Sequence, residues 1–126
     1  MKYVLDASAV LALLNGEAGA EHVIDKLTDA GMSTVNAIEV SSKLIDKGMT
    51  PELAWEALDL LEIPLHDLDV ALARAAAALR NPTKSRGLSL ADRACLALAD
   101  REGAPALTAD RNWADLDLPC PVEFIR

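Results

Sequence analysis

The chain has 126 residues, of which 52% are hydrophobic and 25% are charged, a composition typical of one globular domain over residues 1–126 and not of a disordered chain. Its formal net charge of -8 at pH 7 excludes a general polyanion-binding surface, so a nucleic acid partner would need a local source of positive charge. No apolar stretch approaches the roughly 20 residues that span a bilayer, and the N-terminus lacks a secretory signal pattern. We therefore expect a cytoplasmic protein with no membrane association.

Apolar runs separated by turn signals predict short strands that alternate with helices. The expected strands are residues 3–5, 33–35, 63–65, 106–108 and 122–125. The expected helices are residues 7–14, 20–30, 37–47, 51–61, 69–79 and 89–101. Gly31 is expected to cap the second helix, and residues 80–87 are expected to form a basic loop. This alternation indicates an α/β fold with a central parallel sheet and helices on both faces.

The two cysteines, Cys95 and Cys120, lie far apart without the spacing of a zinc site or a disulfide framework. Cys95 stands among alanine and leucine residues. We interpret it as a small buried hydrophobic residue.

Asp6 interrupts an otherwise continuous apolar run, directly after the first expected strand. A carboxylate in such surroundings loses several kcal/mol of hydration unless a cation, a set of N–H donors or a proton compensates for the loss. Glu39 and Asp92 begin the helices expected at 37–47 and 89–101, and Asp110 follows the fourth strand. Because strand-to-helix turns open at the carboxyl edge of a parallel sheet, we expect the four acids to share one rim.

Each acid also has a purely structural interpretation. Asp6 and Asp110 can cap helices. Asp92 can complete a capping box with the serine three residues before it, and Glu39 can pair with Lys43 one turn later. As a group, however, clustered carboxylates repel and raise one another's pKa, and a hard divalent cation removes that conflict. Binding of Mg²⁺ or Mn²⁺ is the more economical interpretation.

Four segments in register resemble the motifs of one enzyme family, and together they span essentially the whole chain. They are VLDASA at 4–9, NAIEV at 36–40, LSLAD at 88–92 and LTADR at 107–111. The sequence is similar to the PIN-domain ribonucleases, and in particular to the VapC-type toxins of bacterial and archaeal toxin–antitoxin pairs.

The resemblance implies a three-layer α/β/α fold and divalent-metal-dependent cleavage of structured RNA in single-stranded loops, leaving a 5'-phosphate and a 3'-hydroxyl. It assigns metal binding and catalysis to Asp6, Glu39, Asp92 and Asp110, with supporting contacts from the hydroxyls of Ser8 and Thr108. It also implies a cognate antitoxin as partner.

One departure from the family pattern concerns the metal site. Many relatives carry a further acid where this chain has neutral Asn112. Asp115 is a candidate substitute from the next turn. Whether one metal ion or two are bound therefore stays open.

Basic residues near the four motifs are the expected source of local positive charge for an RNA substrate. They are Lys43, Lys84, Arg86, Arg93 and Arg111. For Lys84 and Arg86, ordinary solvated charge is the alternative interpretation. Aromatic residues make up only 3% of the chain, so base stacking should contribute little.

The helices expected at 37–47 and 51–61 carry more apolar side chains than one side of a small sheet would cover, which predicts a homodimer. These side chains are Ile38, Ile45, Leu53, Trp55, Leu58 and Leu61. The alternative is that Trp55 folds onto the core of its own chain.

Three other classes of protein are alternatives to this interpretation. A receiver-type signalling domain would need paired acids after the first strand and a lysine after the fifth. A phosphatase with an aspartyl nucleophile would need an acid where Ser8 stands. The serious alternative is a PIN-like module that has weak or no catalytic activity and binds proteins, with its acids kept as helix caps.

Overall fold

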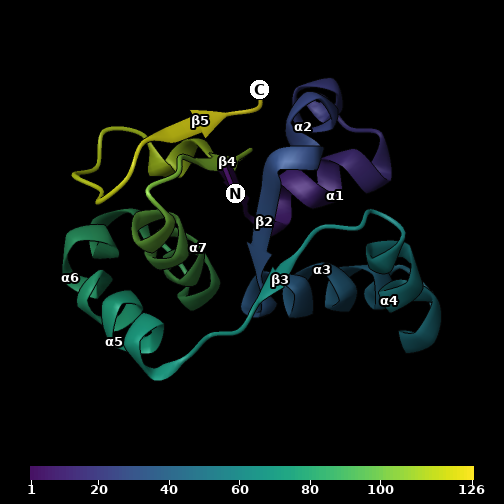
Figure 1. Ribbon diagram of the computed structural model, residues 1–126, viewed down its shortest axis with the longest axis horizontal. Coiled ribbons are helices and arrows are strands. Elements are labelled where there is room, and N and C mark those ends of the chain that lie inside the picture. The colour runs from purple at the N-terminus through teal and green to yellow at the C-terminus, as the bar shows by residue number, and fades with distance from the viewer.

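A five-stranded parallel sheet forms the middle layer of the computed structural model, which describes residues 1–126 (Figure 1). The strand order is β3-β2-β1-β4-β5. The strands are β1 (Tyr3–Leu5), β2 (Ala30–Ser33), β3 (Leu65–His66), β4 (Ala106–Thr108) and β5 (Val122–Phe124). The predicted three-layer α/β/α fold with a central parallel sheet is confirmed.

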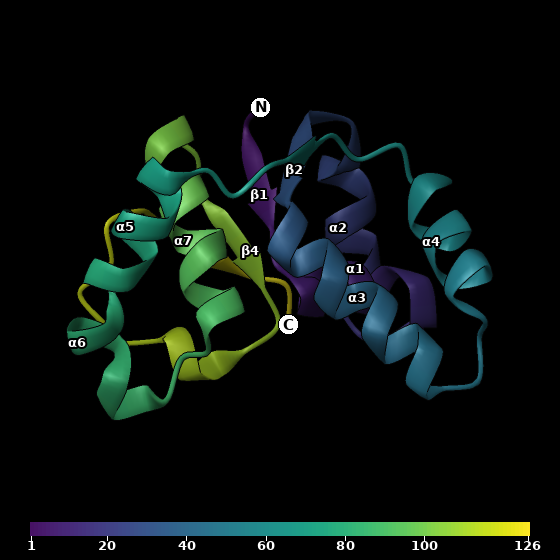
Figure 2. The ribbon, with the colours of Figure 1, turned by 90° about the horizontal axis from the view of Figure 1, so that it is seen from below.

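Seven helices and three short 3-10 turns connect the strands. The helices are α1 (Ala7–Asn15), α2 (Ala20–Lys26), α3 (Thr34–Asp46), α4 (Pro51–Asp59), α5 (Val70–Ala78), α6 (Arg80–Thr83) and α7 (Leu90–Glu102). The 3-10 turns are η1 (Leu27–Asp29), η2 (Lys84–Arg86) and η3 (Arg111–Trp113). Figure 2 shows α1 to α4 on one side of the sheet and α5 to α7 on the other.

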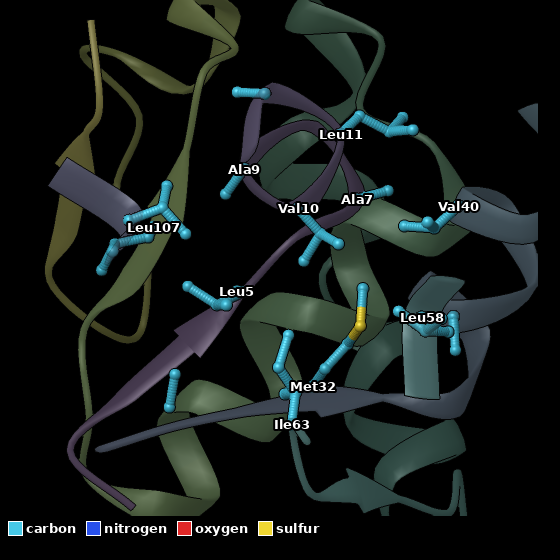
Figure 3. Close-up of a cluster of buried hydrophobic side chains, with 14 of the residues drawn as sticks. Leu5, Ala7, Ala9, Val10, Leu11, Met32, Val40, Leu58, Ile63 and Leu107 are labelled. Carbon is cyan, nitrogen blue, oxygen red and sulfur yellow. The ribbon is translucent and has the colours of Figure 1, made fainter. Parts of the chain in front are cut away.

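Alternation along the central strands separates the core into two clusters, one on each face of the sheet. Leu5 and Leu107 belong to the cluster that α1, α3 and α4 cover (Figure 3). Their neighbours Val4 and Ala106 belong to the cluster that α5 and α7 cover. Full burial of a leucine or valine side chain contributes about 1.5–3 kcal/mol to the free energy of unfolding. A central strand with both faces covered is therefore stabilised by side chains on each face.

The strand order places a topological switch point at the middle of the sheet. From β1 the chain moves outward to β2 and β3, and it then returns to the other side of β1 to form β4 and β5. The turns after β1 and β4 therefore leave the sheet in different directions and open a crevice between them, which is where ligand sites form in such sheets. Asp6 follows β1 directly, and Asp110 lies two residues after the end of β4.

The second predicted strand was placed wrongly. The strand is Ala30–Ser33, and Thr34 and Val35 already belong to α3. The Ser33 hydroxyl accepts a hydrogen bond from the Val35 N–H and so begins the helix there. Gly31 lies inside β2 and is paired with β1, so it does not cap the second helix, which ends earlier at Lys26.

The expected basic loop at 80–87 is mostly helical. It forms α6 and η2, and the Thr83 hydroxyl donates to the carbonyl oxygen of Leu79, just before the segment. Pro82 lies inside a single four-residue turn, where its missing N–H removes no essential hydrogen bond.

Leu58 is buried and contributes nothing to an exposed apolar surface, whereas Cys95 is buried as predicted. No helix of the structure is long and apolar enough to span a membrane.

Candidate metal centre

Asp6 directly follows β1, caps α1 and is only 3% exposed. Its Oδ1 accepts hydrogen bonds from the Ala9 N–H at 2.9 Å and from the Ser8 hydroxyl at 2.7 Å. Its Oδ2 accepts from the Thr108 hydroxyl on the neighbouring strand β4. The helix-cap interpretation is thus correct for the backbone contact, but the carboxylate is also held by two hydroxyl groups.

Ser8 and Thr108 tie the ends of β1 and β4 together. The Ser8 hydroxyl oxygen accepts from the Ala109 N–H at 2.9 Å, and the Thr108 hydroxyl oxygen accepts from the Asp110 N–H at 3.0 Å. The two hydroxyl oxygens are 3.3 Å apart. This network fixes the orientation of the Asp6 carboxylate relative to the turn that carries Asp110.

Asp92 and Asp110 occupy cap positions in their own elements. Asp92 Oδ2 accepts from the Ser89 N–H at 2.9 Å, and the Ser89 hydroxyl accepts from the Asp92 N–H, so the predicted capping box is present. Asp110 Oδ1 accepts from the Asn112 N–H at 2.9 Å. In both residues the second carboxylate oxygen has no hydrogen-bond partner in the protein.

Glu39 is half-buried in the second turn of α3 and forms no salt bridge with Lys43. Its predicted place at the start of the helix was too early, because α3 begins at Thr34. The Lys43 charge and the Asn36 side chain both favour the ionised form of this carboxyl group.

One pocket of about 410 Å³ brings the four carboxylates together. It is lined by Asp6, Glu39, Asp92 and Asp110, together with Ser8 and Ser89 near them. The oxygen-only character of this donor set suits Mg²⁺ or Mn²⁺. No three His, Cys, Asp or Glu side chains stand close enough together in this arrangement to hold an ion. Binding would therefore require the unpaired carboxylate oxygens to turn towards one point.

The titration behaviour of the pocket reflects burial and mutual repulsion. Burial raises the pKa of Asp6 from 3.8 to about 6, against the opposing effect of its hydrogen bonds. Burial, and then the charge of Asp92, raises the pKa of Glu39. Burial also raises the pKa of Asp92, and the charge of Asp110 adds to this effect. A divalent cation would reverse each of these penalties.

Of the basic residues expected around the site, only Lys43 lines the pocket. Arg93 donates to the Ala76 carbonyl oxygen on α5, and Arg111 donates to the Arg126 carbonyl oxygen while stacking on Phe124. Lys84 and Arg86 lie in η2, outside the pocket lining.

Asp115 does not supply the acid that is missing at Asn112. Its side chain is 89% exposed, and it lies 3.9 Å from Arg86 outside the pocket lining. Its backbone adopts a positive φ of 62°, so the turn directs the chain away from a continued helix.

Two residues at the site were missed from the sequence. Asn36 is fully buried, and its Nδ2 donates at 3.1 Å to the carbonyl oxygen of Ala91, beside Asp92, while its Oδ1 has no partner. It thereby joins α3, which carries Glu39, to the first turn of α7. Lys47 also lines the pocket. Asn36 lies three residues before Glu39, and Lys47 lies eight residues after it. These helical spacings place both residues near the face that carries Glu39, and this was the signal in the sequence.

Residues 3–118 match the PIN domain family, a range that contains all four carboxylates. The chain therefore belongs to the PIN domain family. No curated protein matches the sequence.

The fold of the chain is also similar to that of several solved structures. A DNA-bound VapBC from Salmonella typhimurium is 16% identical, with a TM-score of 0.76 and coverage of 100% of this chain and 99% of that chain. A toxin–antitoxin complex from Klebsiella pneumoniae is 17% identical, with a TM-score of 0.77 and coverage of 99% and 98%. VapBC-5 from Mycobacterium tuberculosis is 24% identical, with a TM-score of 0.62 and coverage of 99% and 98%.

Ionisation of Asp6 should lower the stability of the PIN domain when no metal ion is bound. Because the folded-state pKa is raised from 3.8 to about 6, ionisation of Asp6 destabilises the fold as pH rises through this window, and the full penalty holds above it. The difference corresponds to roughly 3 kcal/mol. Asp6→Asn removes this contribution, so its free energy of unfolding relative to wild type should be higher at pH 7.5 than at pH 4.

Urea unfolding of both proteins in a chelator, at the two pH values, measures this difference. Asp25→Asn, which alters an exposed acid of α2, is the control and should show no such pH-dependent gain. A stability difference between Asp6→Asn and wild type that is the same at pH 4 and pH 7.5 would contradict the prediction.

Proposed function

We propose that this PIN domain is a divalent-metal-dependent endoribonuclease and the toxin of a toxin–antitoxin pair, with structured RNA as its substrate. The observation that carries the proposal is the pocket in which Asp6, Glu39, Asp92 and Asp110 meet at the switch point of the sheet. Membership of the PIN domain family supports a nuclease. The named VapBC structures that share the fold support the toxin role.

The four carboxylates would hold Mg²⁺ or Mn²⁺, which when bound would supply charge stabilisation at the scissile phosphate and a nucleophilic water near neutral pH. The chain's own residues prepare the site. Ser8 and Thr108 hold both oxygens of Asp6, and the Ser89 N–H holds one oxygen of Asp92 while leaving the other unpaired. Water would attack the phosphate in line, leaving a 5'-phosphate and a 3'-hydroxyl.

A cognate antitoxin is the proposed protein partner. An arginine or lysine of a partner peptide, inserted among the four carboxylates, would form charge-assisted hydrogen bonds and exclude the metal. Apolar residues beside it could occupy the adjoining groove. We place the protein and its RNA substrate in the cytoplasm.

A homodimer is part of the proposal, and exposed apolar residues on α3 and α4 support it. Ile38 is 60% exposed, Leu53 is 55% exposed, and Ile45 and Trp55 are each 38% exposed. Several large apolar side chains exposed on two packed helices are typical of an interface. The exposure of Trp55 also argues against its complete burial in its own core.

We predict that the purified protein cleaves structured RNA at a limited set of sites with Mn²⁺ and not with a chelator. Asp92→Asn should lower the cleavage rate by more than about 100-fold, since loss of groups that only support metal ligands already costs 10–100-fold. Asp100→Asn, which alters an exposed acid on the same helix, is the matched control and should cleave as wild type does. Sequencing of the RNA ends would identify the sites and the 5'-phosphate.

The same three proteins, induced from one promoter at equal soluble expression and without an antitoxin, test the role in the cell. Wild type and Asp100→Asn should arrest growth, whereas Asp92→Asn should not. Equal growth of all three would reject the toxin role. Absence of any Mn²⁺-dependent cleavage would instead favour a PIN-like protein-binding module.

We also predict that the protein is a dimer at tens of micromolar and that Leu53→Glu converts it to a monomer. A charged side chain cannot be buried at an apolar interface without a large desolvation cost. Light scattering measures the mass. Val70→Glu, an exposed position on α5 in the opposite helical layer, is the control and should remain dimeric. A monomeric wild type would show that the apolar surface of α3 and α4 has another role.

A further inference from the structure

The pocket extends beyond the four carboxylates as a groove between α1 and α3. Helix α3 lines it with Glu39, Lys43 and, at its C-terminal cap, Lys47. These residues are four apart, so they lie on one helical face. Helix α1 lines the opposite wall with Leu11 and Asn15, which are also four apart. Figure 2 shows the two helices next to each other.

Charge is distributed unevenly along this groove. Asp6, Asp92 and Asp110 lie at one end with Glu39, and the two lysines lie beyond Glu39 along α3. Glu17, the remaining acid of the lining, is paired with Arg126 at 3.2 Å. The lysine end therefore concentrates positive charge, which Glu39 balances only in part, in a protein whose net charge is -8.

Lys43 and Lys47 are exposed, and neither takes part in a salt bridge. The arginines near the other sides of the pocket have partners of their own. Arg86 donates to the Asn112 carbonyl oxygen, and Arg93 and Arg111 donate to carbonyl oxygens elsewhere. Free cationic groups consequently line the groove on one side of the acidic centre.

The spacing of the lysines fits a nucleic acid strand. With a rise of about 1.5 Å per residue, the lysine backbone positions are displaced about 6 Å and about 12 Å along the axis of α3 from Glu39. These steps are comparable to the separation of successive phosphates along an extended single strand. Flexible lysine side chains suit phosphate as point charges.

We propose that the groove between α1 and α3 is a phosphate-binding track for the RNA strand on one side of the scissile bond. Lys43 binds the phosphate next to the scissile one, and Lys47 binds the following phosphate. On the other side of the scissile bond the strand meets no free cation of the pocket lining. This inference rests on the proposed nuclease function and adds the direction in which the substrate lies.

The test measures the affinity of a fluorescent single-stranded RNA oligonucleotide in Ca²⁺ as a function of KCl concentration, with the RNA checked for integrity. Lys43→Gln and Lys47→Gln should each weaken binding several-fold at moderate salt. Each should reduce the slope of log affinity against log salt by about 0.7, and the double variant by about twice that. Lys2→Gln, at the opposite edge of the sheet, is the control and should bind as wild type does.

Substrate modification tests the direction. A single uncharged methylphosphonate linkage next to the cleavage site should slow cleavage in Mn²⁺ on one side only. On that side, wild type and Lys43→Gln should cleave the modified substrate at the same rate. Equal losses on both sides would overturn the one-sided track.

The outcomes separate this inference from the nuclease proposal. Unchanged salt dependence in the double variant overturns the track even if RNA is cleaved, and it would assign the lysines to a protein partner. An equal loss in Lys2→Gln also overturns it, since that result indicates general electrostatics. Lysine-dependent binding without cleavage supports the track and rejects the nuclease. Absence of RNA binding at low salt rejects both.

Discussion

The burial of the Asp6 carboxylate at the end of the central strand is the constraint on which the rest of the site depends. Three hydrogen bonds, from the Ala9 N–H and the hydroxyls of Ser8 and Thr108, offset part of its lost hydration. They do not offset all of it, because the pKa of Asp6 remains raised to about 6. The remaining penalty is the physical reason to expect a cation at this position.

The fold converts this local cost into a site by bringing other acids to the same edge. Parallel pairing of β1 with β4 places Asp110 beside Asp6, and α3 and α7 bring Glu39 and Asp92. Asn36 links these two helices through the Ala91 carbonyl oxygen. Because Asp6, Asp92 and Asp110 also accept hydrogen bonds from backbone N–H groups of their own helices or turns, the site needs few residues beyond those that form the fold. Without a bound metal ion, the domain therefore has a lower free energy of unfolding than it would have with neutral residues in place of these acids.

Much of this arrangement could be predicted from the sequence because it follows from strand ends. Asp6 directly follows one apolar strand, Asp110 lies two residues after another, and the capping box of Ser89 and Asp92 is a local pattern. The second strand was placed three residues too late because Ala30 and Gly31 have weak strand propensity. Pairing with β1 and β3 on both sides overrides that propensity.

Side-chain directions were the part that the sequence did not determine. Arg93 and Arg111 stand next to Asp92 and Asp110 in the chain, yet both turn to carbonyl oxygens on other elements. Neighbours in sequence on a helix point to different faces, so adjacency to an acid is a poor guide to the pocket. Lys47 is eight residues from Glu39 in the sequence but lies on the same helical face and lines the pocket. It was missed because distance along the chain is an equally poor guide.

The most direct measurement of the central claim is the number of protons released when Mn²⁺ binds. Isothermal titration calorimetry near pH 6, in buffers with different ionisation enthalpies, determines this number. With the pKa of Asp6 at about 6, about half of the Asp6 side chains are protonated in the metal-free protein, so binding should release about half a proton from this group. Release should decline as the pH is raised to 7.5. Mn²⁺ binding with no proton release at pH 6, or no binding at all, would contradict the account.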